Sequence, residues 1–247
     1  MPETRDRPAF YALSPGGWRD YWSLLHPPYT LWHLSYVVIG AALAPRIRVG
    51  WLLETLAAFL FAMGLAAHAL DELNGRPLRT RIPDGVLRAI AVVGLGVAVG
   101  LGIHGAVEVS PWLWVFIVVG AFLVVAYNLE LVGGAAHSDL WFALAWGAFP
   151  ALTAYFAQTG AIRVQAVLAA GACAAISGGQ RALSTPVRRL RRSVRDVRGE
   201  IVLADGSIES LDAASIRAAP ERALRWFSLA MPLLASALLL VRLVRHA

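Results

Sequence analysis

Ionisable side chains gather where one apolar run of the sequence ends, within AAHALDELNGRPLRTRIPDG. His68, Asp71 and Glu72 are spaced i, i+3 and i+4, so a helix would place them on one face. Carboxylate oxygens suit Mg²⁺, which binds phosphates, and histidine also allows Zn²⁺, Mn²⁺ or iron. Arg76 and Arg79 follow at once, and guanidinium groups grip diphosphates through paired hydrogen bonds. The predicted chemistry is metal-assisted handling of a diphosphate, with His68, Asp71 and Glu72 as its catalytic residues.

A second polar group follows another apolar run, in YNLELVGGAAHSDLW. If both runs end on the same side of the molecule, an imidazole and carboxylates from two helices could hold one divalent cation. The predicted metal ligands are Asp71, Glu72, His68, Glu130, His137 and Asp139, and the predicted substrate-binding residues are Arg76, Arg79, Tyr127, Asn128, Gln180, Arg181 and His33.

Purely structural interpretations of these residues stay open. Acidic residues at helix ends often cap helices or pair with nearby arginines, as Asp71 and Glu72 could with Arg76. Ser138 or Asp139 could be the N-cap of a helix. His33 could lie at a membrane interface instead of lining the site.

The composition of the chain indicates which kind of secondary structure must position these ionisable side chains. Of the 247 residues, 58% are hydrophobic and 15% are charged, and the mean hydropathy is +0.60. Soluble domains usually carry about 45–50% apolar and about 25% charged residues, so lipid must cover the excess apolar surface. The one cysteine, Cys173, excludes an internal disulfide framework.

Seven segments are apolar enough to predict transmembrane helices, because a span needs about 20 mainly apolar residues. Prolines and glycines separate them, as at Pro45, Pro77, Pro111 and Gly133-Gly134. The sequence thus predicts an all-α, polytopic transmembrane helix bundle with spans at residues 29–44, 49–70, 86–104, 112–131, 139–157, 164–183 and 226–244.

The loop arginines predict the orientation of this bundle. With the N-terminus inside, 17 arginines fall on the inner side and five on the outer side, and these sum to the 22 basic residues. Cytoplasmic loops carry the excess of arginine, so we expect an inner-membrane protein with a cytoplasmic N-terminus.

One segment, residues 186–224, does not resemble a span. It opens with a dense arginine run, and GEIVLADGSIESL then reads as two strands around an Asp205-Gly206 turn. The predicted domains are an N-terminal segment (1–22), a membrane bundle (23–185), an arginine-rich cytoplasmic insertion (186–224) and a C-terminal transmembrane helix (225–247). Nucleic acid is not an expected partner, because no aromatic residues alternate with the arginines.

Three stretches resemble the UbiA-type membrane prenyltransferase superfamily: LLHPPYTLWHLSYVVIGAAL, ALDELNGRPLRTRIPDG, and YNLELVGG with the following WGAFPALTAYFAQTG. The resemblance implies transfer of a prenyl group from an isoprenoid diphosphate to a lipophilic or aromatic acceptor, with Mg²⁺ held by two Asp-rich motifs. It also places Gln180 and Arg181 near the second of those motifs.

The sequence departs from this family pattern at both motifs. Counting back from Pro83-Asp84-Gly85 puts Asp71 at the last aspartate of the first motif, whereas Gly64 and Ala67 stand where two others would be. The stretch after the sixth span, AISGGQRALSTPVRRLRRSVRDVRG, holds no acid before Asp196.

Several functions therefore stay open. The chain could bind an isoprenoid diphosphate through arginines, run a different metal-dependent chemistry, or serve as a non-catalytic lipid-binding or scaffold protein. A small transporter is a weaker alternative, because no paired broken helices mark a midplane site.

Overall fold

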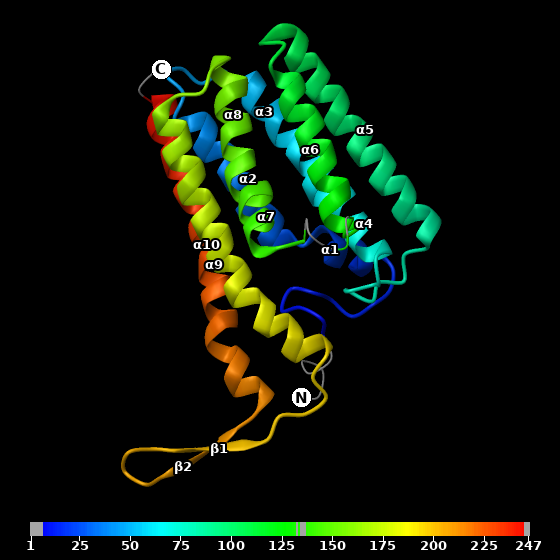
Figure 1. Cartoon of the computed structure of the whole chain (residues 1–247), viewed down its shortest axis with the longest axis vertical. Coiled ribbons are helices and arrows are strands. Elements are labelled where there is room, and N and C mark those ends of the chain that lie inside the picture. Colours follow the sequence, from blue (N-terminus) through cyan, green and yellow to red (C-terminus); the bar gives the residue numbers. More distant parts are fainter. Residues whose placement is uncertain (1–6, 132, 134–136, 245–247) are drawn as a thin grey trace.

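The computed structural model describes residues 7–131, 133 and 137–244. Residues 1–6 of the predicted N-terminal segment, Gly134 of the predicted break and residues 245–247 of the predicted last segment lie outside this description. The chain forms a bundle of long helices with one small hairpin at its lower end (Figure 1).

The elements follow the predicted order along the chain. Two short or medium helices open it, α1 (Trp18–Leu25) and α2 (Pro27–Ala42). The remaining elements are α3 (Val49–Phe59), η2 (Leu60–Ala67), α4 (His68–Leu73), α5 (Asp84–Glu108), α6 (Leu113–Asn128), α7 (Asp139–Ala143), η3 (Leu144–Ala148), α8 (Phe149–Thr159), α9 (Val164–Arg192), β1 (Gly199–Val202), β2 (Ile208–Leu211) and α10 (Ala213–Val244).

Each of the seven predicted spans is helical. Four continuous helices are long and apolar enough to cross a membrane, Val49–Leu73, Asp84–Glu108, Asp139–Thr159 and Ala213–Val244, and Leu113–Asn128 is a shorter apolar helix. The predicted helical membrane bundle is confirmed, because length and apolar composition together define a spanning helix.

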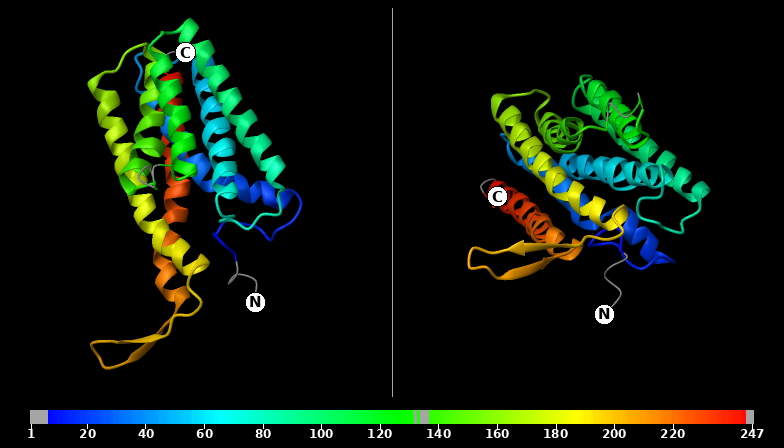
Figure 2. Two further views of the ribbon diagram at one scale, coloured as in Figure 1. Left: turned by 45° about the vertical axis from the view of Figure 1, so that its right-hand side comes forward. Right: turned by 60° about the horizontal axis from the view of Figure 1, so that its bottom comes forward.

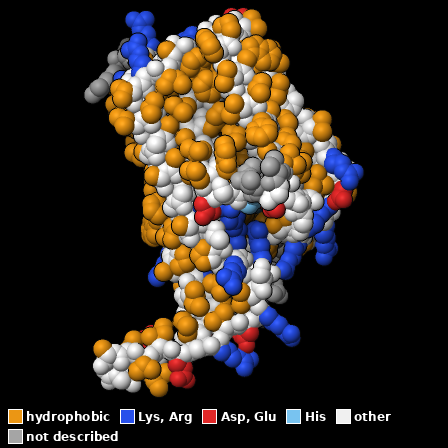
Figure 3. Space-filling view, in the orientation of Figure 1, with side chains coloured by type: hydrophobic (Ala, Val, Ile, Leu, Met, Phe, Trp, Pro, Cys, Tyr) orange, Lys and Arg blue, Asp and Glu red, His pale blue; other side chains and the backbone are white. Residues whose placement is uncertain are grey.

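The surface explains the composition. Large apolar side chains point outward along the helices, among them Val92, Val107, Val118 and Leu168, each at least 64% exposed. Figure 3 shows hydrophobic atoms across the upper part of one face, with arginine side chains gathered below them. Exposing so many apolar side chains to water is unfavourable. The part of the surface that carries them therefore faces lipid.

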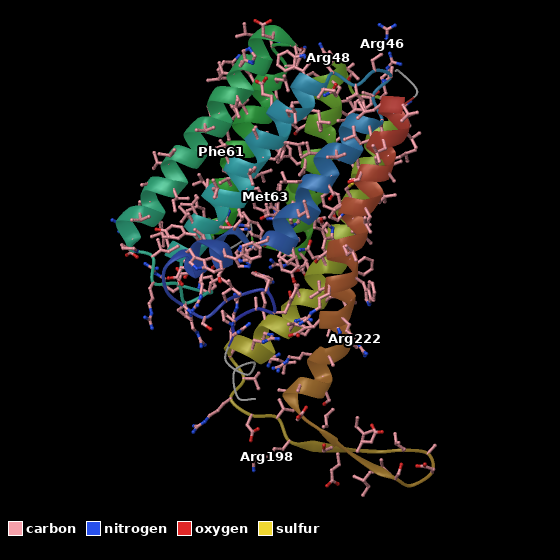
Figure 4. All side chains as sticks on the ribbon, turned by 180° about the vertical axis from the view of Figure 1, so that it is seen from behind. Arg46, Arg48, Phe61, Met63, Arg198 and Arg222 are labelled. Atoms are coloured by element: carbon pink, nitrogen blue, oxygen red, sulfur yellow. The ribbon has the colours of Figure 1, made fainter. Side chains whose placement is uncertain are left out.

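The two ends of the bundle differ in what they carry. The N-terminal segment and the hairpin lie at one end and the C-terminus at the other (Figure 1). Figure 4 shows Arg46 and Arg48 at the C-terminal end and Arg198 and Arg222 toward the hairpin, with Met63 between the two ends. The α4–α5 and α6–α7 loops, which carry the predicted chemistry, both lie toward the hairpin end.

The hairpin has the predicted form. β1 and β2 pair antiparallel, with Val202 opposite Ile208, and Gly206 takes the positive φ of 84° that the turn requires. The Asp205 carboxylate accepts hydrogen bonds from the backbone N–H and hydroxyl of Ser207. The left view of Figure 2 shows the hairpin projecting beyond the end of the bundle.

The helices beside the hairpin are longer than the predicted boundaries at residues 185 and 224 imply. α9 continues through Pro186 to Arg192, and α10 runs without a break from Ala213 into the last span. Arg191 and Glu221 explain the extension, since their largely buried side chains form a two-bonded ion pair at 2.6 and 2.9 Å.

Two spans contain a π-helical segment, η2 and η3. A wider π turn frees backbone carbonyls from the regular i to i−4 pattern, and such turns concentrate at functional sites. Here each segment offers one carbonyl to a histidine. His68 Nδ1 lies 3.0 Å from the Gly64 oxygen, and His33 Nδ1 lies 2.9 Å from the Trp146 oxygen.

The second π segment packs against α9 at very short range through Gly147. A Cβ atom at Gly147 would lie 2.5 Å from the Cys173 carbonyl oxygen and 2.8 Å from the Ser177 hydroxyl. Only glycine allows this approach, which fixes η3 and the neighbouring Trp146 against α9.

We expect Gly147→Ala to destabilise the protein by about 2 kcal/mol, because an added methyl forces two packed backbones apart. Thermal unfolding of the purified protein in detergent measures the change. Gly171→Ala is the matched control, since Gly171 is in α9 with open space around it. Equal melting temperatures for the two variants would contradict this packing.

Candidate functional site

An apolar pocket lies between the helices of the bundle. Helices α3, α5, α6 and α8 and both π segments surround it. Its lining is mainly small or aromatic and includes Ala62, Leu95, Phe116, Gly120 and Phe149. Small-molecule sites usually have largely apolar walls, so the lining of this pocket suits a hydrophobic ligand.

The inner end of the pocket meets a polar region at Met63 and Trp146. The Trp146 ring packs edge-on against Tyr127 at 5.6 Å between centroids. The Tyr127 hydroxyl oxygen accepts a hydrogen bond from the guanidinium of Arg181. An apolar chamber and a cationic group are therefore separated by two aromatic rings.

Several groups hold the guanidinium of Arg181 in this region. Its Nε donates to Asp139 at 2.8 Å, and its guanidinium also contacts the His137 carbonyl oxygen. The same group lies 5.3 Å from the Phe142 ring centroid. Because Asp139 partly neutralises its charge and several groups fix its orientation, Arg181 suits the role of positioning Tyr127.

Arg188 and Arg192 continue this positive charge along α9. In the described residues, their side-chain hydrogen bonds are long, at 3.3 Å from Arg188 to Thr185 and 3.4 Å from Arg192 to the Pro8 carbonyl oxygen. Both guanidinium groups interact electrostatically with Asp71. Arg188 and Arg192 are held by fewer and longer hydrogen bonds than Arg181, so they are the better candidates for contacting a bound anion.

His68 and Asp71, two of the three residues that the helical spacing predicts on one face, both lie in α4. His68 is packed against His26, with ring centroids 4.0 Å apart. The Asp71 carboxylate makes no direct hydrogen bond or ion pair within the part of the chain that the structure describes. We call His26, His68, Asp71, Tyr127, His137, Arg181, Arg188 and Arg192 the polar layer.

His26 precedes the α2 span with a φ of 48°, in the left-handed region. Burial, with added repulsion from His68, Arg192 and Arg188, holds its pKa well below the ordinary value. His26 is therefore neutral at neutral pH. Its Nδ1 is buried without a hydrogen-bond partner among the described atoms.

Glu72 has a different position from the one that the helical spacing predicts. Its side chain is fully buried and accepts bonds from the backbone N–H groups of Leu78 and Thr80 and from the Thr80 hydroxyl, at 2.8–2.9 Å. Both carboxylate oxygens are thereby occupied in shaping the α4–α5 loop. This carboxylate is not available to a metal ion or substrate in this structure.

Arg76 and Arg79 also lie away from the polar layer. Arg76 forms an ion pair with Asp84 and donates to the Ile82 carbonyl oxygen at 2.6 Å, so it closes the same loop. The Arg79 side chain is exposed. Of the predicted substrate-binding arginines, Arg181 alone lies in the polar layer.

The second predicted loop contributes in part. His137 stacks on Tyr127 at 4.4 Å, and its Nδ1 lies 3.9 Å from the Glu130 carboxylate. Asn128 is buried and donates to the Val124 carbonyl oxygen at 2.7 Å. Asp139 is exposed apart from its bond to Arg181.

The six predicted metal ligands are therefore not gathered. Among residues 7–131, 133 and 137–244, no three His, Cys, Asp or Glu side chains form a group that could hold a metal ion. The residues present do not fit a protein-held metal centre, because Glu72 and Asp139 are already bonded elsewhere. The involvement of Mg²⁺ or another divalent metal stays a prediction.

His33 and Gln180 lie deeper, as buried residues of α2 and α9. His33 Nδ1 is bound to the Trp146 carbonyl, and its ring lies 5.9 Å from that of Phe142. The buried Gln180 Oε1 has no hydrogen-bond partner among the described residues. Both frame the junction where the pocket ends.

The N-terminal segment is a part of the site that sequence patterns did not indicate. Tyr11 packs edge-on against His26 at 5.2 Å and Tyr29 at 5.4 Å. The buried Asp20 carboxylate accepts from the backbone N–H groups of Gly16 and Arg81 and so ties this segment to the α4–α5 loop. The segment covers the hairpin end of the polar layer.

Comparison with known proteins adds to this geometry. The chain is similar to a protoheme IX farnesyltransferase of Alkalilimnicola ehrlichii, with 29% identity over 61% of this chain and 54% of that protein. That relative is a UbiA-type membrane prenyltransferase. This weak similarity supports a divergent member of the UbiA superfamily.

This UbiA-like chain spans about half the length of the relative that it matches. No protein-family profile matches it, and no solved structure matches it. The relationship confirms the resemblance seen in the sequence and supports a prenyltransferase-like membrane protein.

Proposed function

We propose that this UbiA-like protein binds an isoprenoid diphosphate and transfers its prenyl group to a lipophilic or aromatic acceptor. The observation that carries the proposal is the junction at Trp146 and Tyr127, where the apolar pocket meets the arginines of the polar layer. An amphiphile with a hydrocarbon tail and an anionic head matches both sides of that junction.

In the proposed reaction, the allylic C–O bond breaks and its electron pair leaves with the diphosphate. Arg188 and Arg192 stabilise the departing charge, and Arg181 holds Tyr127 beside the reacting carbon. The rings of Tyr127 and Trp146 shelter the allylic cation through their π faces. The acceptor then bonds to this carbon and loses a proton.

We place the polar layer on the cytoplasmic side of the inner membrane. The proposal rests on the arginine distribution, with 17 on the predicted inner side and five on the predicted outer side. Isoprenoid diphosphates are highly charged and do not cross a bilayer unaided, so a cytoplasmic opening would admit them.

A second candidate function is non-catalytic binding of an isoprenoid or lipid. The absence of a carboxylate cluster among the described residues favours this function. The resemblance to UbiA-type enzymes implies that such clusters hold the metal and the diphosphate.

Product analysis separates the two candidates. The protein in lipid nanodiscs is incubated with radiolabelled farnesyl diphosphate and a membrane lipid extract, with Mg²⁺ or with a chelator. We expect release of inorganic diphosphate together with label in a new lipophilic product. Binding without release would favour the non-catalytic function, and absence of binding would overturn both.

The chelator and the variant Asp71→Asn resolve the metal question. If Mg²⁺ joins the bound diphosphate through Asp71, chelation and the variant should lower turnover alike. Turnover that persists in both would assign the anion to the arginines alone.

A further inference from the structure

The hairpin of β1 and β2 is exposed on both faces and at both edges. Every residue from 198 to 210 is exposed, and the two strands form a sheet with each other alone among the described residues. Val202 and Ile208 lie opposite each other and are 70% and 63% exposed. A hairpin of two strands is only marginally stable in water, whereas a third strand or a packed face stabilises it. The hairpin therefore offers an apolar pair and two open strand edges to a neighbour.

The charge of the hairpin is opposite to that of the chain around it. Residues 199–211 contain Glu200, Asp205 and Glu209 and no basic residue, although the whole chain has 22 basic residues and a formal charge of +6. Asp205 is used within the turn, where it accepts hydrogen bonds from Ser207. Glu200 and Glu209 form no ion pair within the described part of the chain. Two carboxylates are thus open to a basic group from outside.

The strand register determines what each edge presents. Ile208 and Ser210 lie on one face of β2 and Glu209 lies on the other, because side chains alternate along a strand. A strand added beside β2 would therefore meet an apolar side chain on one face and a carboxylate on the opposite face. On β1, by contrast, Glu200 shares its face with Val202. The edge of β2 suits a strand in which apolar and basic residues alternate.

A second copy of this chain is a poor occupant of that edge. Pairing two such hairpins would bring Glu200 and Glu209 near the carboxylates of the other copy, and like charges between adjacent strands are destabilising. Proline and lysine, which often block exposed edges, are absent from residues 199–211. The edge is therefore guarded against its own kind and open to a strand of positive charge.

A lipid surface is also a poor occupant. Residues 213–225 of α10 lie between the hairpin and the predicted last span, and Figure 1 shows α10 running down to the hairpin. At 1.5 Å per residue this stretch of helix is about 20 Å long. The headgroup layer extends only about 5–8 Å beyond the hydrocarbon core on each side. Anionic headgroups would in addition repel the carboxylates of the hairpin.

We propose that the edge of β2 docks a protein partner that supplies an extended segment of alternating apolar and basic residues. The segment adds to the sheet as a third strand, and its backbone forms the hydrogen bonds that the open edge lacks. Its apolar side chains pack beside Ile208, and its basic side chains meet Glu209 on the other face. The hairpin lies outside the pocket and the polar layer, so the inference does not depend on the proposed function.

Peptide binding tests this inference on the full-length protein. The protein in nanodiscs of zwitterionic phosphatidylcholine is titrated with a fluorescent peptide in which valine alternates with arginine. We expect saturable binding by fluorescence anisotropy, and slower amide hydrogen exchange in β1 and β2. A peptide with glutamate in place of arginine should bind at least about tenfold more weakly, because it opposes the carboxylates. N-methylation of the arginine peptide should weaken binding similarly, because it removes the backbone donors.

Matched variants locate the site on one edge. Glu209→Lys should weaken the arginine peptide about tenfold, since it replaces an attraction by a repulsion. Glu200→Lys makes the same charge change on β1, one strand farther away, and should stay within about twofold at physiological salt. Replacing residues 199–211 by a glycine–serine linker should abolish binding. Thermal unfolding verifies that the bundle is folded in each variant.

Four results would overturn the inference. Equal effects of the two lysine substitutions would reduce the binding to unspecific attraction, and binding retained by the linker variant would place the peptide elsewhere. A dimer by mass photometry that the linker variant loses would make a second copy the occupant. Slower exchange in the hairpin on adding anionic lipid, without peptide, would make it a lipid surface. The proposed function stands in each case, since farnesyl diphosphate binding is measured separately.

Discussion

Replacing Arg188 and Arg192 together by alanine should weaken the binding of farnesyl diphosphate about 100-fold. A hydrogen bond to a charged group contributes about 1.5–3 kcal/mol, and about 1.4 kcal/mol corresponds to a factor of ten. Two such contacts give a loss of at least this size. Equilibrium binding in nanodiscs measures it, and inorganic diphosphate should lose affinity in parallel because the head group alone is affected.

The control is Arg222→Ala, an exposed arginine of α10 toward the same end of the molecule. It removes the same charge away from the polar layer and should leave affinity within about twofold, as expected for a screened surface charge. Equal effects of the double variant and this control would remove the arginines from the anion site. Melting temperatures show whether loss of the Arg192 contact to Pro8 unfolds the N-terminal segment.

Filling the apolar pocket is the second substitution with a large expected effect. Ala62→Trp places an indole in the pocket lining of η2. Displacing about 100 Å² of tail contact costs about 2.5 kcal/mol at about 25 cal/mol per Å², which approaches a 100-fold loss of affinity. Farnesyl diphosphate should therefore bind far more weakly, while inorganic diphosphate binds as before.

Val118→Trp controls for the added bulk, because Val118 of α6 is 64% exposed on the outer surface of the bundle. It should leave both affinities unchanged. If Ala62→Trp weakens inorganic diphosphate as strongly as farnesyl diphosphate, the substitution has disturbed the polar layer, and the pocket has not been shown to hold the tail.

Hydropathy and turn chemistry sufficed to predict the fold. Seven apolar segments became seven helical segments, since nothing but a helix satisfies the backbone of such a run in lipid. The hairpin followed from Asp205-Gly206 between two short β-prone runs. The extension of α9 to Arg192 and the unbroken run of α10 into the last span were not predicted, because the ion pair of Arg191 with Glu221 joins residues 30 apart.

The candidate site was predictable only in part. Helical spacing correctly placed His68 beside Asp71 on one helix, but the same spacing treated Glu72 as a third member. Glu72 follows a π segment in its span. Its carboxylate instead points inward, where it accepts a hydrogen bond from the Thr80 N–H of the α4–α5 loop. Periodicity carries no information about which backbone N–H groups will surround a side chain.

Long-range contacts were the other missing element. His33 and Trp146 are 113 residues apart, and Tyr11 reaches the polar layer from a segment without helical periodicity. The junction between pocket and arginines exists only after such segments meet. A single sequence shows which residues are capable of chemistry, whereas the packing of the bundle determines which of them share one site.

In the proposed function, one amphiphile occupies the apolar pocket with its head at the polar layer. Photo-crosslinking tests it most directly, using farnesyl diphosphate with a diazirine at the end of its tail and mass spectrometry of the labelled peptides. We predict adducts near Glu54, on the pocket side of α5 and at Phe116, lost in Ala62→Trp and competed by unlabelled farnesyl diphosphate. Adducts confined to the lipid-facing surface, such as Val118 and Leu233, would contradict the account.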